Sequence, residues 1–328
     1  AAHRYRGGIM TIYVTSLKHV ALTVPDPAVG RDFYEAFGLQ PKERTDKVAM
    51  RCHGRDQDQI VLLEGPEKRV HHYAFTATEE GVAKVRERVE SRGIPVFDEA
   101  PEGADDGGIW FQDFENMWVN VVDVDPAPPV SYDDVPEVNV GGRYPRVDIP
   151  AWRSSPKEPR PRRLGHSLMF TSSVPDAQEF YGDILGLRLS DRIMAQPPGA
   201  PAPFPVVAFM NVGVGDHHVF GFVQGTHRGF HHASFEVSGL DEMAIGADKL
   251  NSAGASMCFG LGRHALGSNL FHYTRDPWGS WVEYFSDIDQ ITTAWQAKDW
   301  DDSEAPVALW GPPQPDEFFQ NHEPEPRS

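Results

Sequence analysis

The chain has 328 residues, of which 40% are hydrophobic and 24% charged, and its formal net charge is −18 at pH 7. This length suits two domains of ordinary size, and the acidic balance argues against binding to nucleic acid or anionic membrane surfaces. No apolar run approaches the roughly 18 residues of a membrane span. The two cysteines, Cys52 and Cys258, argue against a disulfide framework and favour a reducing cytoplasm.

A short N-terminal extension, residues 1–14, comes first, and its opening residues lack the apolar core and cleavage site of a secretory peptide. An internal repeat follows. Residues 17–38, LKHVALTVPDPAVGRDFYEAFG, are similar to residues 164–186, LGHSLMFTSSVPDAQEFYGDILG. Each copy predicts a short apolar strand with a histidine, then Pro-Asp, then a helix with Phe-Tyr that ends at glycine.

The second half of the repeated unit also occurs twice. VHHYAF at 70–75 matches FHHASF at 230–235, and a helical segment follows each copy. DFENMWVN at 113–120 matches DPWGSWVE at 276–283, which predicts a turn followed by a strand. The sequence therefore predicts an α+β fold of two tandem βαβββ-type modules whose curved sheets surround a cavity.

The repeat also sets the predicted boundaries. We place the N-terminal module at 15–125, a linker rich in Pro, Asp and Arg at 126–160, and the C-terminal module at 161–288. The tail, 289–328, is acidic and proline-rich, and we expect it to run extended rather than to form a third domain.

Candidate metal ligands lie on three separated strands predicted in the C-terminal module. They are His166, His232 and Glu283. Two neutral imidazoles and one carboxylate leave metal positions open, which is the donor set of non-haem Fe(II) oxygenases. Spacing alone does not separate His232 from its neighbour His231.

The N-terminal module has His19, His72 and Asn120 at the equivalent positions. An amide supplies no negative charge and is a poor ligand for iron. We therefore predict that this module has no functional metal site, and that each chain holds about one iron or manganese ion.

The strings LGHSLMF, FHHASFEV and WVEYFSD resemble the vicinal oxygen chelate superfamily, and within it the two-module type I extradiol dioxygenases. These enzymes cleave the rings of catechol and dihydroxybiphenyl. The resemblance covers about residues 15–288. It implies that His166, His232 and Glu283 hold Fe(II), with Mn(II) as an alternative, and that the partners are a catecholic substrate and O₂. It also selects His232 over His231.

The resemblance implies roles for three further residues. His218 is at the position of the acid/base histidine, which would take a proton from the catechol and return it later. Tyr273 would donate a hydrogen bond to the substrate oxygen, and His264 would donate one to a later intermediate.

Two neighbouring features refine the expected site. Period-two alternation along HHVFGFV puts His218, Phe220 and Phe222 on one strand face, and we expect that face to line the cavity, with His217 on the other. Leu168 stands where a branch acting on homoprotocatechuate-like substrates has asparagine, which favours an apolar-substituted catechol.

Three other functions fit parts of the sequence. A glyoxalase-type isomerase would draw its ligands from two modules, a hydroxyphenylpyruvate-type dioxygenase would not need His218, His264 and Tyr273, and a small-molecule-binding resistance protein would be a single module without the triad. The sequence leaves open whether segment 195–205 is a surface loop or a cavity wall, and whether the segment that starts at Trp310 forms a lid. We expect a homo-oligomer.

Overall fold

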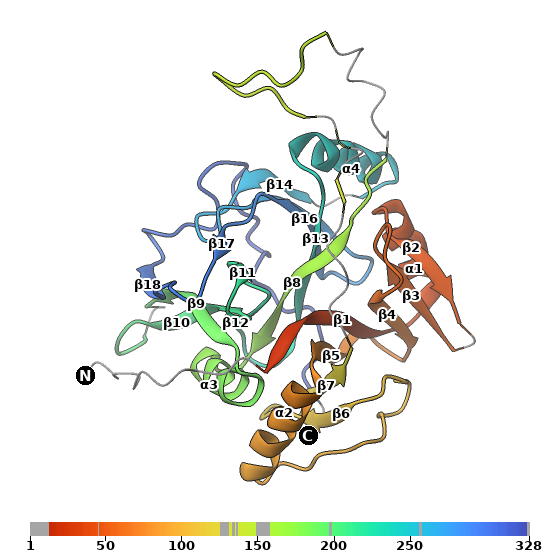
Figure 1. The fold of residues 1–328 in the computed structure, drawn as a ribbon, viewed down its shortest axis with the longest axis vertical. Helices are drawn as coiled ribbons and strands as arrows, with labels where there is room; N and C mark the ends of the chain where they lie inside the picture. Colours follow the sequence, from red (N-terminus) through yellow and green to blue (C-terminus); the bar gives the residue numbers. More distant parts are fainter. Residues whose placement is uncertain are drawn as a thin grey trace.

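The computed structural model describes residues 13–44, 46–124, 131–132, 135, 137–148, 158–196, 199–255 and 258–326. Most of the predicted N-terminal extension and much of the predicted linker lie outside these ranges. Figure 1 shows two mixed sheets, one in each repeat, lying side by side. The sheets have seven and nine strands, and a small two-stranded pair is formed by β11 and β17.

The N-terminal sheet has the strand order β2-β3-β4-β1-β5-β7-β6. In chain order, the N-terminal module contains β1 (Val14–Val24), α1 (Pro27–Ala36), β2 (Gln40–Glu43), β3 (Lys47–Arg51), β4 (Asp58–Glu64), β5 (Arg69–Ala77), α2 (Glu79–Ser91), β6 (Ile109–Gln112) and β7 (Trp118–Asp123).

The C-terminal sheet has the strand order β14-β15-β16-β13-β8-β12-β10-β9-β18. Its module and the tail contain β8 (Arg163–Thr171), α3 (Val174–Leu185), β9 (Arg188–Ala195), β10 (Phe204–Asn211), β11 (Gly215–Asp216), β12 (Phe220–Gln224), β13 (Gly229–Glu236), α4 (Leu240–Ser252), β14 (Cys258–Arg263), β15 (Leu270–Arg275), β16 (Trp281–Ser286), β17 (Gln290–Ile291) and β18 (Lys298–Asp301).

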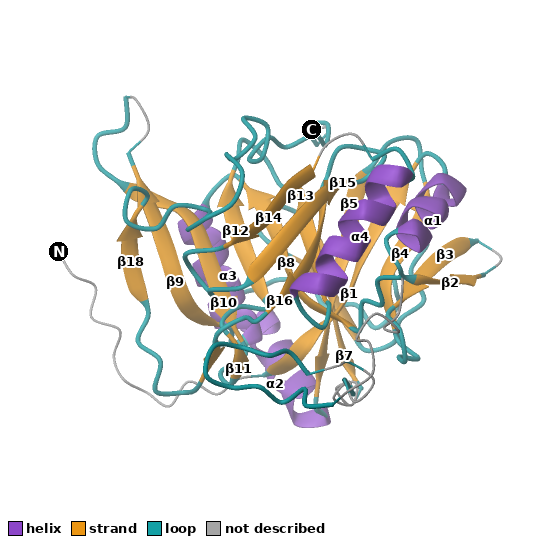
Figure 2. Ribbon diagram, turned by 90° about the horizontal axis from the view of Figure 1, so that it is seen from above, coloured by secondary structure: helices purple, strands orange, loops and turns teal. Residues whose placement is uncertain are grey.

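The pairing of the strands repeats between the modules. β1 pairs with β4 in parallel and with β5 in antiparallel orientation, and β8 pairs with β12 and β13 in the same two ways. Figure 2 shows the strands running through the middle of the molecule. The predicted α+β fold with two modules is confirmed.

The N-terminal caps of α1 and α3 show which residues of the two repeats are equivalent. Asp26 caps α1 by accepting a hydrogen bond from the backbone N–H of Ala28, and Ser173 caps α3 by accepting from Asp176. The caps Asp26 and Ser173 are equivalent. The Pro-Asp pair of the second copy lies instead inside the first turn of α3, so the two Pro-Asp pairs are not equivalent.

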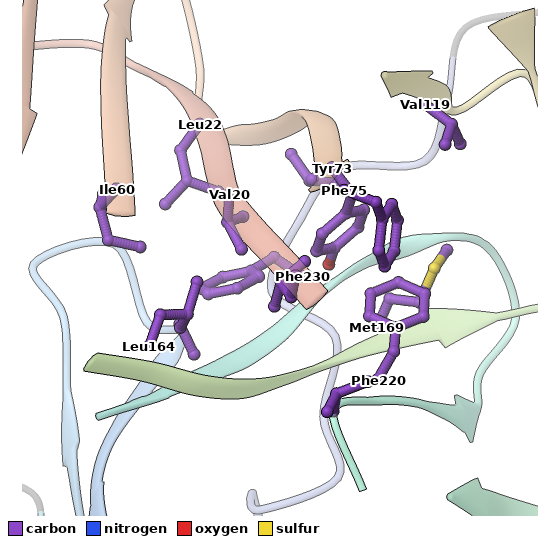
Figure 3. Close-up of a cluster of buried hydrophobic side chains, with 14 of the residues drawn as sticks. Val20, Leu22, Ile60, Tyr73, Phe75, Val119, Leu164, Met169, Phe220 and Phe230 are labelled. Carbon is purple, nitrogen blue, oxygen red and sulfur yellow. The ribbon is translucent and has the colours of Figure 1, made fainter. Parts of the chain in front are cut away.

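The modules share one hydrophobic core. Figure 3 shows Val20 and Tyr73 of the N-terminal sheet meeting Met169, Phe220 and Phe230 of the C-terminal sheet. The rings of Tyr73 and Phe220 lie edge to face, with centroids 4.8 Å apart. The two repeats therefore fold against each other rather than as separately packed domains.

The tail packs against the C-terminal module. β18 extends the sheet by pairing in parallel with β9, and Trp310 forms a bridge with Arg263. Phe318 and Glu323 are buried, and Glu323 forms a buried ion pair with Lys68. The described residues of the tail thus add one strand to the sheet and cover part of the fold. Among the described helices, none is both long and apolar enough to cross a membrane.

Candidate active site

Three donor side chains meet on adjacent strands of the nine-stranded sheet. His166 lies on β8, His232 on β13 and Glu283 on β16. The Nε2 atom of His166 is 3.0 Å from Oε2 of Glu283, and Nε2 of His232 is 3.5 Å from the same oxygen. The three ligand atoms all lie within 4.8 Å of one another. The structure thus brings together the three ligands predicted from the sequence.

The electrostatics of this cluster fit a cation. Burial opposes ionisation of Glu283, but the hydrogen bond with His166 and the nearby imidazoles of His264 and His232 outweigh it and hold the pKa of that carboxyl well below its usual range. Nε2 of His232 is buried and has no hydrogen-bond partner within the described structure. A buried carboxylate beside an unpaired imidazole nitrogen is a suitable environment for a divalent metal ion.

An irregularity in β13 explains why two consecutive histidines lie near the site. The register of β13 against β8 shifts between Phe230 and His232, so His231 is the extra residue of a β-bulge. Nδ1 of His231 is 2.7 Å from Nδ1 of His232, and both rings line the same pocket. His231 therefore contacts the Nδ1 edge of the His232 ring, whereas Nε2 on the other edge lies near Glu283.

We expect His232→Ala to lose the metal, whereas His231→Ala should keep it. Of these two neighbouring histidines, His232 is the one whose ring nitrogen, Nε2, lies near the carboxylate of Glu283. His231 can orient that ring through Nδ1, so its loss should weaken metal binding by no more than about 10-fold to 100-fold. Metal content after desalting distinguishes the two variants. Loss of metal from His231→Ala with retention in His232→Ala would reverse the assignment.

Tyr273 and His264 lie beside the carboxylate. Nδ1 of His264 is 2.6 Å from the carbonyl oxygen of Val307, which can only accept, so Nδ1 carries the proton. Nε2 of neutral His264 is then an acceptor, and the hydroxyl of Tyr273 donates to it over 3.0 Å. His264 could donate to a substrate from Nε2 only as an imidazolium, which restricts the donor role predicted for it. Burial and the charge of Glu283 raise the pKa of Tyr273 well above its ordinary value, so its hydroxyl remains a donor.

His218 lines the pocket, with its ring centroid 4.3 Å from that of His166. Nε2 of His217 donates to the buried carboxylate of Asp191 over 2.9 Å, and Nδ1 of His217 is 3.1 Å from Nδ1 of His218. In neutral His217 this nitrogen accepts, so His218 donates from Nδ1 and keeps an unprotonated Nε2. Burial lowers the pKa of His218 well below its ordinary value. Asp191 and His217 therefore hold His218 in the tautomer of a base.

The predicted strand around His218 is wrong in one respect. His218 precedes β12, which begins at Phe220, and Phe220 and Phe222 pack in the core against Tyr181 rather than in the pocket. The aromatic neighbour of His218 is Phe209 on β10, with ring centroids 4.8 Å apart. His217 is also buried. The chain bends between β11 and β12, which interrupts the alternation on which the prediction depended.

The walls of the pocket are apolar and come from the sheet and the tail. Sheet residues and their connections contribute Leu168, Ile193, Val207, Phe209 and Leu266, and the tail contributes Pro306, Val307, Phe318 and Phe319. No Lys or Arg is among the described residues that line it. The described residues of segment 195–205 do not line it either, and Trp310 itself is 47% exposed.

Comparison with known proteins assigns the chain to a superfamily. It matches the Glyoxalase/Bleomycin resistance protein/Dioxygenase superfamily over residues 16–121 and 163–284, one match in each module. The chain belongs to this superfamily.

Individual members agree with that assignment. Metapyrocatechase 2 of Cupriavidus necator is 36% identical over 318 residues, which are 94% of this chain and 93% of that protein. Biphenyl-2,3-diol 1,2-dioxygenase of Sphingomonas paucimobilis is 30% identical over 122 residues, 37% of this chain and 40% of that protein.

Two solved structures show the same fold at low identity. Homoprotocatechuate 2,3-dioxygenase from Arthrobacter globiformis has a TM-score of 0.74 at 18% identity and covers 94% of this chain and 91% of its own. The Mn(II)-bound glyoxalase from Novosphingobium aromaticivorans has a TM-score of 0.69 at 23% identity and covers 94% and 98%.

The N-terminal module of this superfamily member contains a carboxylate that the comparison of the repeats did not reveal. Asn120 forms no hydrogen bond with His19 or His72 within the described structure, and its amide nitrogen donates to the backbone carbonyls of Gly107 and Ile109. A carboxylate nevertheless reaches the two histidines, because Asp106 lies within 3.4 Å of His19 Nε2. Comparison of equivalent strands could not find Asp106, since it comes from a loop.

Proposed function

We propose that this superfamily member is an extradiol dioxygenase, which cleaves the ring of a catecholic aromatic beside its two hydroxyls and incorporates both atoms of O₂. The observation that carries the proposal is the buried cluster of His166, His232 and Glu283 beneath an apolar pocket that also contains His218 and Tyr273. The metal would be Fe(II), with Mn(II) as the alternative, and when bound it would supply adjacent positions for both catechol oxygens and O₂.

The side chains around the cluster have distinct tasks. Glu283 cancels one unit of the charge of the metal. His218 accepts a catechol proton at Nε2 and returns it during ring cleavage, a task suited to a histidine that is neutral and fixed in one tautomer. When substrate binds, Tyr273 would turn its hydroxyl from Nε2 of His264 to the substrate oxygen and donate a hydrogen bond there. The apolar walls hold the ring and exclude water.

The pocket favours an apolar ring substituent. Leu168 and Phe209 offer no hydrogen bond, and the absence of Lys and Arg among the described lining residues leaves a substrate carboxylate without a counter-ion. We therefore infer that 3-methylcatechol or 2,3-dihydroxybiphenyl is a better substrate than homoprotocatechuate. We also propose a cytoplasmic location, which the two free cysteines Cys52 and Cys258 support, and a homo-oligomeric state.

A substrate panel tests the proposal. The chain is reconstituted anaerobically with Fe(II), mixed with catechol, 3-methylcatechol, 2,3-dihydroxybiphenyl or homoprotocatechuate, and exposed to air. We expect a yellow conjugated product, with the highest kcat/KM for an apolar-substituted catechol. No product from any catechol would favour an isomerase, a hydroxyphenylpyruvate-type dioxygenase or a binding protein. A preference for homoprotocatechuate would contradict the proposed substrate class alone.

A further inference from the structure

A second cluster of metal-binding side chains lies in the N-terminal module. It consists of His19 on β1, His72 on β5 and Asp106 in the loop before β6. Nε2 of His19 is 2.8 Å from Nε2 of His72 and 3.4 Å from Oδ2 of Asp106. Ligands of a tetrahedral zinc ion with bonds of about 2.0–2.1 Å lie roughly 3.3 Å apart. The three donor atoms are therefore spaced for one small cation.

The lone pair of His72 is directed into this cluster. Nε2 of His71 is 3.1 Å from the carbonyl oxygen of Glu102, so this nitrogen must donate. Nδ1 of neutral His71 then accepts from Nδ1 of His72, 2.7 Å away. The remaining nitrogen of His72, Nε2, carries no proton and faces His19. Such a second contact is what orients metal-binding histidines in proteins.

Hydrogen bonds from two buried side chains hold the loop that carries Asp106 in place. Asn120 donates to the carbonyls of Gly107 and Ile109 over 2.9 and 3.2 Å, and Trp110 Nε1 donates to the carbonyl of Asp106 over 3.1 Å. Asn120 is the counterpart of Glu283. Asn120 provides no carboxylate at this position. Asp106 provides one instead, from a loop that hydrogen bonds with Asn120 hold in place.

Lys18 competes for the same donors. Its ammonium donates to Oδ1 of Asp106 over 2.5 Å and to Nδ1 of His19 over 3.2 Å, so Nε2 of neutral His19 carries the proton and donates to Nε2 of His72. Departure of Lys18 lets this proton move to Nδ1 and frees Nε2 of His19 as a ligand. Lys18 and Asp106 also line a surface cleft, so the ammonium can move into solvent and an ion can arrive from there. The C-terminal module has Gly165 at the position of Lys18 and hence no such competitor.

We propose that His19, His72 and Asp106 form a second divalent-cation site, which takes a zinc-like ion in exchange for the Lys18 ammonium. Two imidazoles and one carboxylate leave a fourth position for water, and such a set binds zinc more tightly than ferrous iron. The ion would tie β1, β5 and the loop 101–108 together. This site does not depend on the proposed function and replaces our prediction of a module without metal.

Zinc binding to the iron-loaded full chain tests the site. Zn²⁺ is added anaerobically, excess is removed by dialysis, and zinc and iron are measured in the same sample. We expect about one zinc per chain beyond any zinc that replaces iron in the C-terminal triad, which has the same kind of donor set. Zinc that binds only as iron leaves belongs to the C-terminal site and overturns the proposal. Absence of bound zinc overturns it too, since Lys18 would then fill the site permanently.

Variants assign the zinc to its ligands. Asp106→Asn should weaken zinc binding by more than about 100-fold. Loss of a residue that only orients a ligand can already cost up to about 100-fold, and Asp106 would be a ligand itself. Lys18→Met should tighten it about tenfold or more, because a nearby positive charge is removed. Asp105→Asn, which removes an adjacent charge but no donor, should leave the affinity within about threefold of the original. His166→Ala should still bind one zinc, whether or not the chain is a dioxygenase.

Thermal unfolding gives a second readout. An ion that binds the folded chain raises Tm in proportion to its saturation, so zinc should raise Tm of the original chain and of Asp105→Asn but not of Asp106→Asn. Equal zinc affinity and equal shifts in Asp106→Asn would overturn the site. Zinc binding by Lys18→Met alone would show that the lysine has replaced the ion, which also overturns it.

Discussion

The variants Glu283→Ala and His166→Ala are expected to retain no iron after desalting and to show no ring cleavage. Glu283 is the single carboxylate of the donor set, is fully buried, and accepts from both His166 and the neighbouring Asn269. Its removal leaves a buried dication facing only neutral imidazoles, and a divalent ion without a compensating charge is strongly disfavoured in such a site. The original chain should hold about one iron ion, from one complete triad.

Metal analysis after anaerobic reconstitution measures this effect, and Glu283→Gln tests charge at nearly constant volume. His227→Ala, which removes a histidine of the same module outside the pocket, should keep iron and activity. The circular dichroism spectrum of each variant establishes that it folds. Iron and activity retained by either Glu283→Ala or His166→Ala would show that the ligand assignment is wrong.

The repeat made the fold predictable because each module uses the same local signals. A capped helix follows a histidine-bearing strand in both, and burial patterns along the paired strands recur. The clustering of His166, His232 and Glu283 could be predicted for the same reason: each lies on a strand of the repeated unit, and the module brings those strands together. What the periodicity could not give is the bulge at His231, since a bulge depends on the partner strand.

Residues that approach the site from distant segments were not predictable from the sequence. Asp191 lies on β9 and reaches the site only through His217, and Val307 fixes His264 from a tail whose composition suggested a solvated segment. The signal available in the tail was its pair of adjacent aromatic residues, Phe318 and Phe319, in an otherwise acidic, proline-rich stretch. Apolar side chains in such a segment indicate a surface on which they pack.

The variant His218→Asn should lower kcat by roughly 10²-fold to 10⁴-fold, the usual loss for a positioned acid/base group, while iron content and catechol affinity stay unchanged. The reason is the relay from Asp191 through His217, which leaves Nε2 of His218 as the unprotonated nitrogen of a pocket-lining residue. The alternation in the sequence puts His217 on the strand face away from the cavity, which by itself predicts a comparatively mild effect for His217→Asn. The structure instead predicts a loss of about 10-fold to 100-fold, since His217 orients the base without touching substrate. Steady-state kinetics with iron-saturated variants separates the effects of the two substitutions.

Full activity in His218→Asn, or a greater loss in His217→Asn than in His218→Asn, would exclude His218 as the proton carrier. The next candidate would then be His264, whose Nε2 lies 3.5 Å from Glu283.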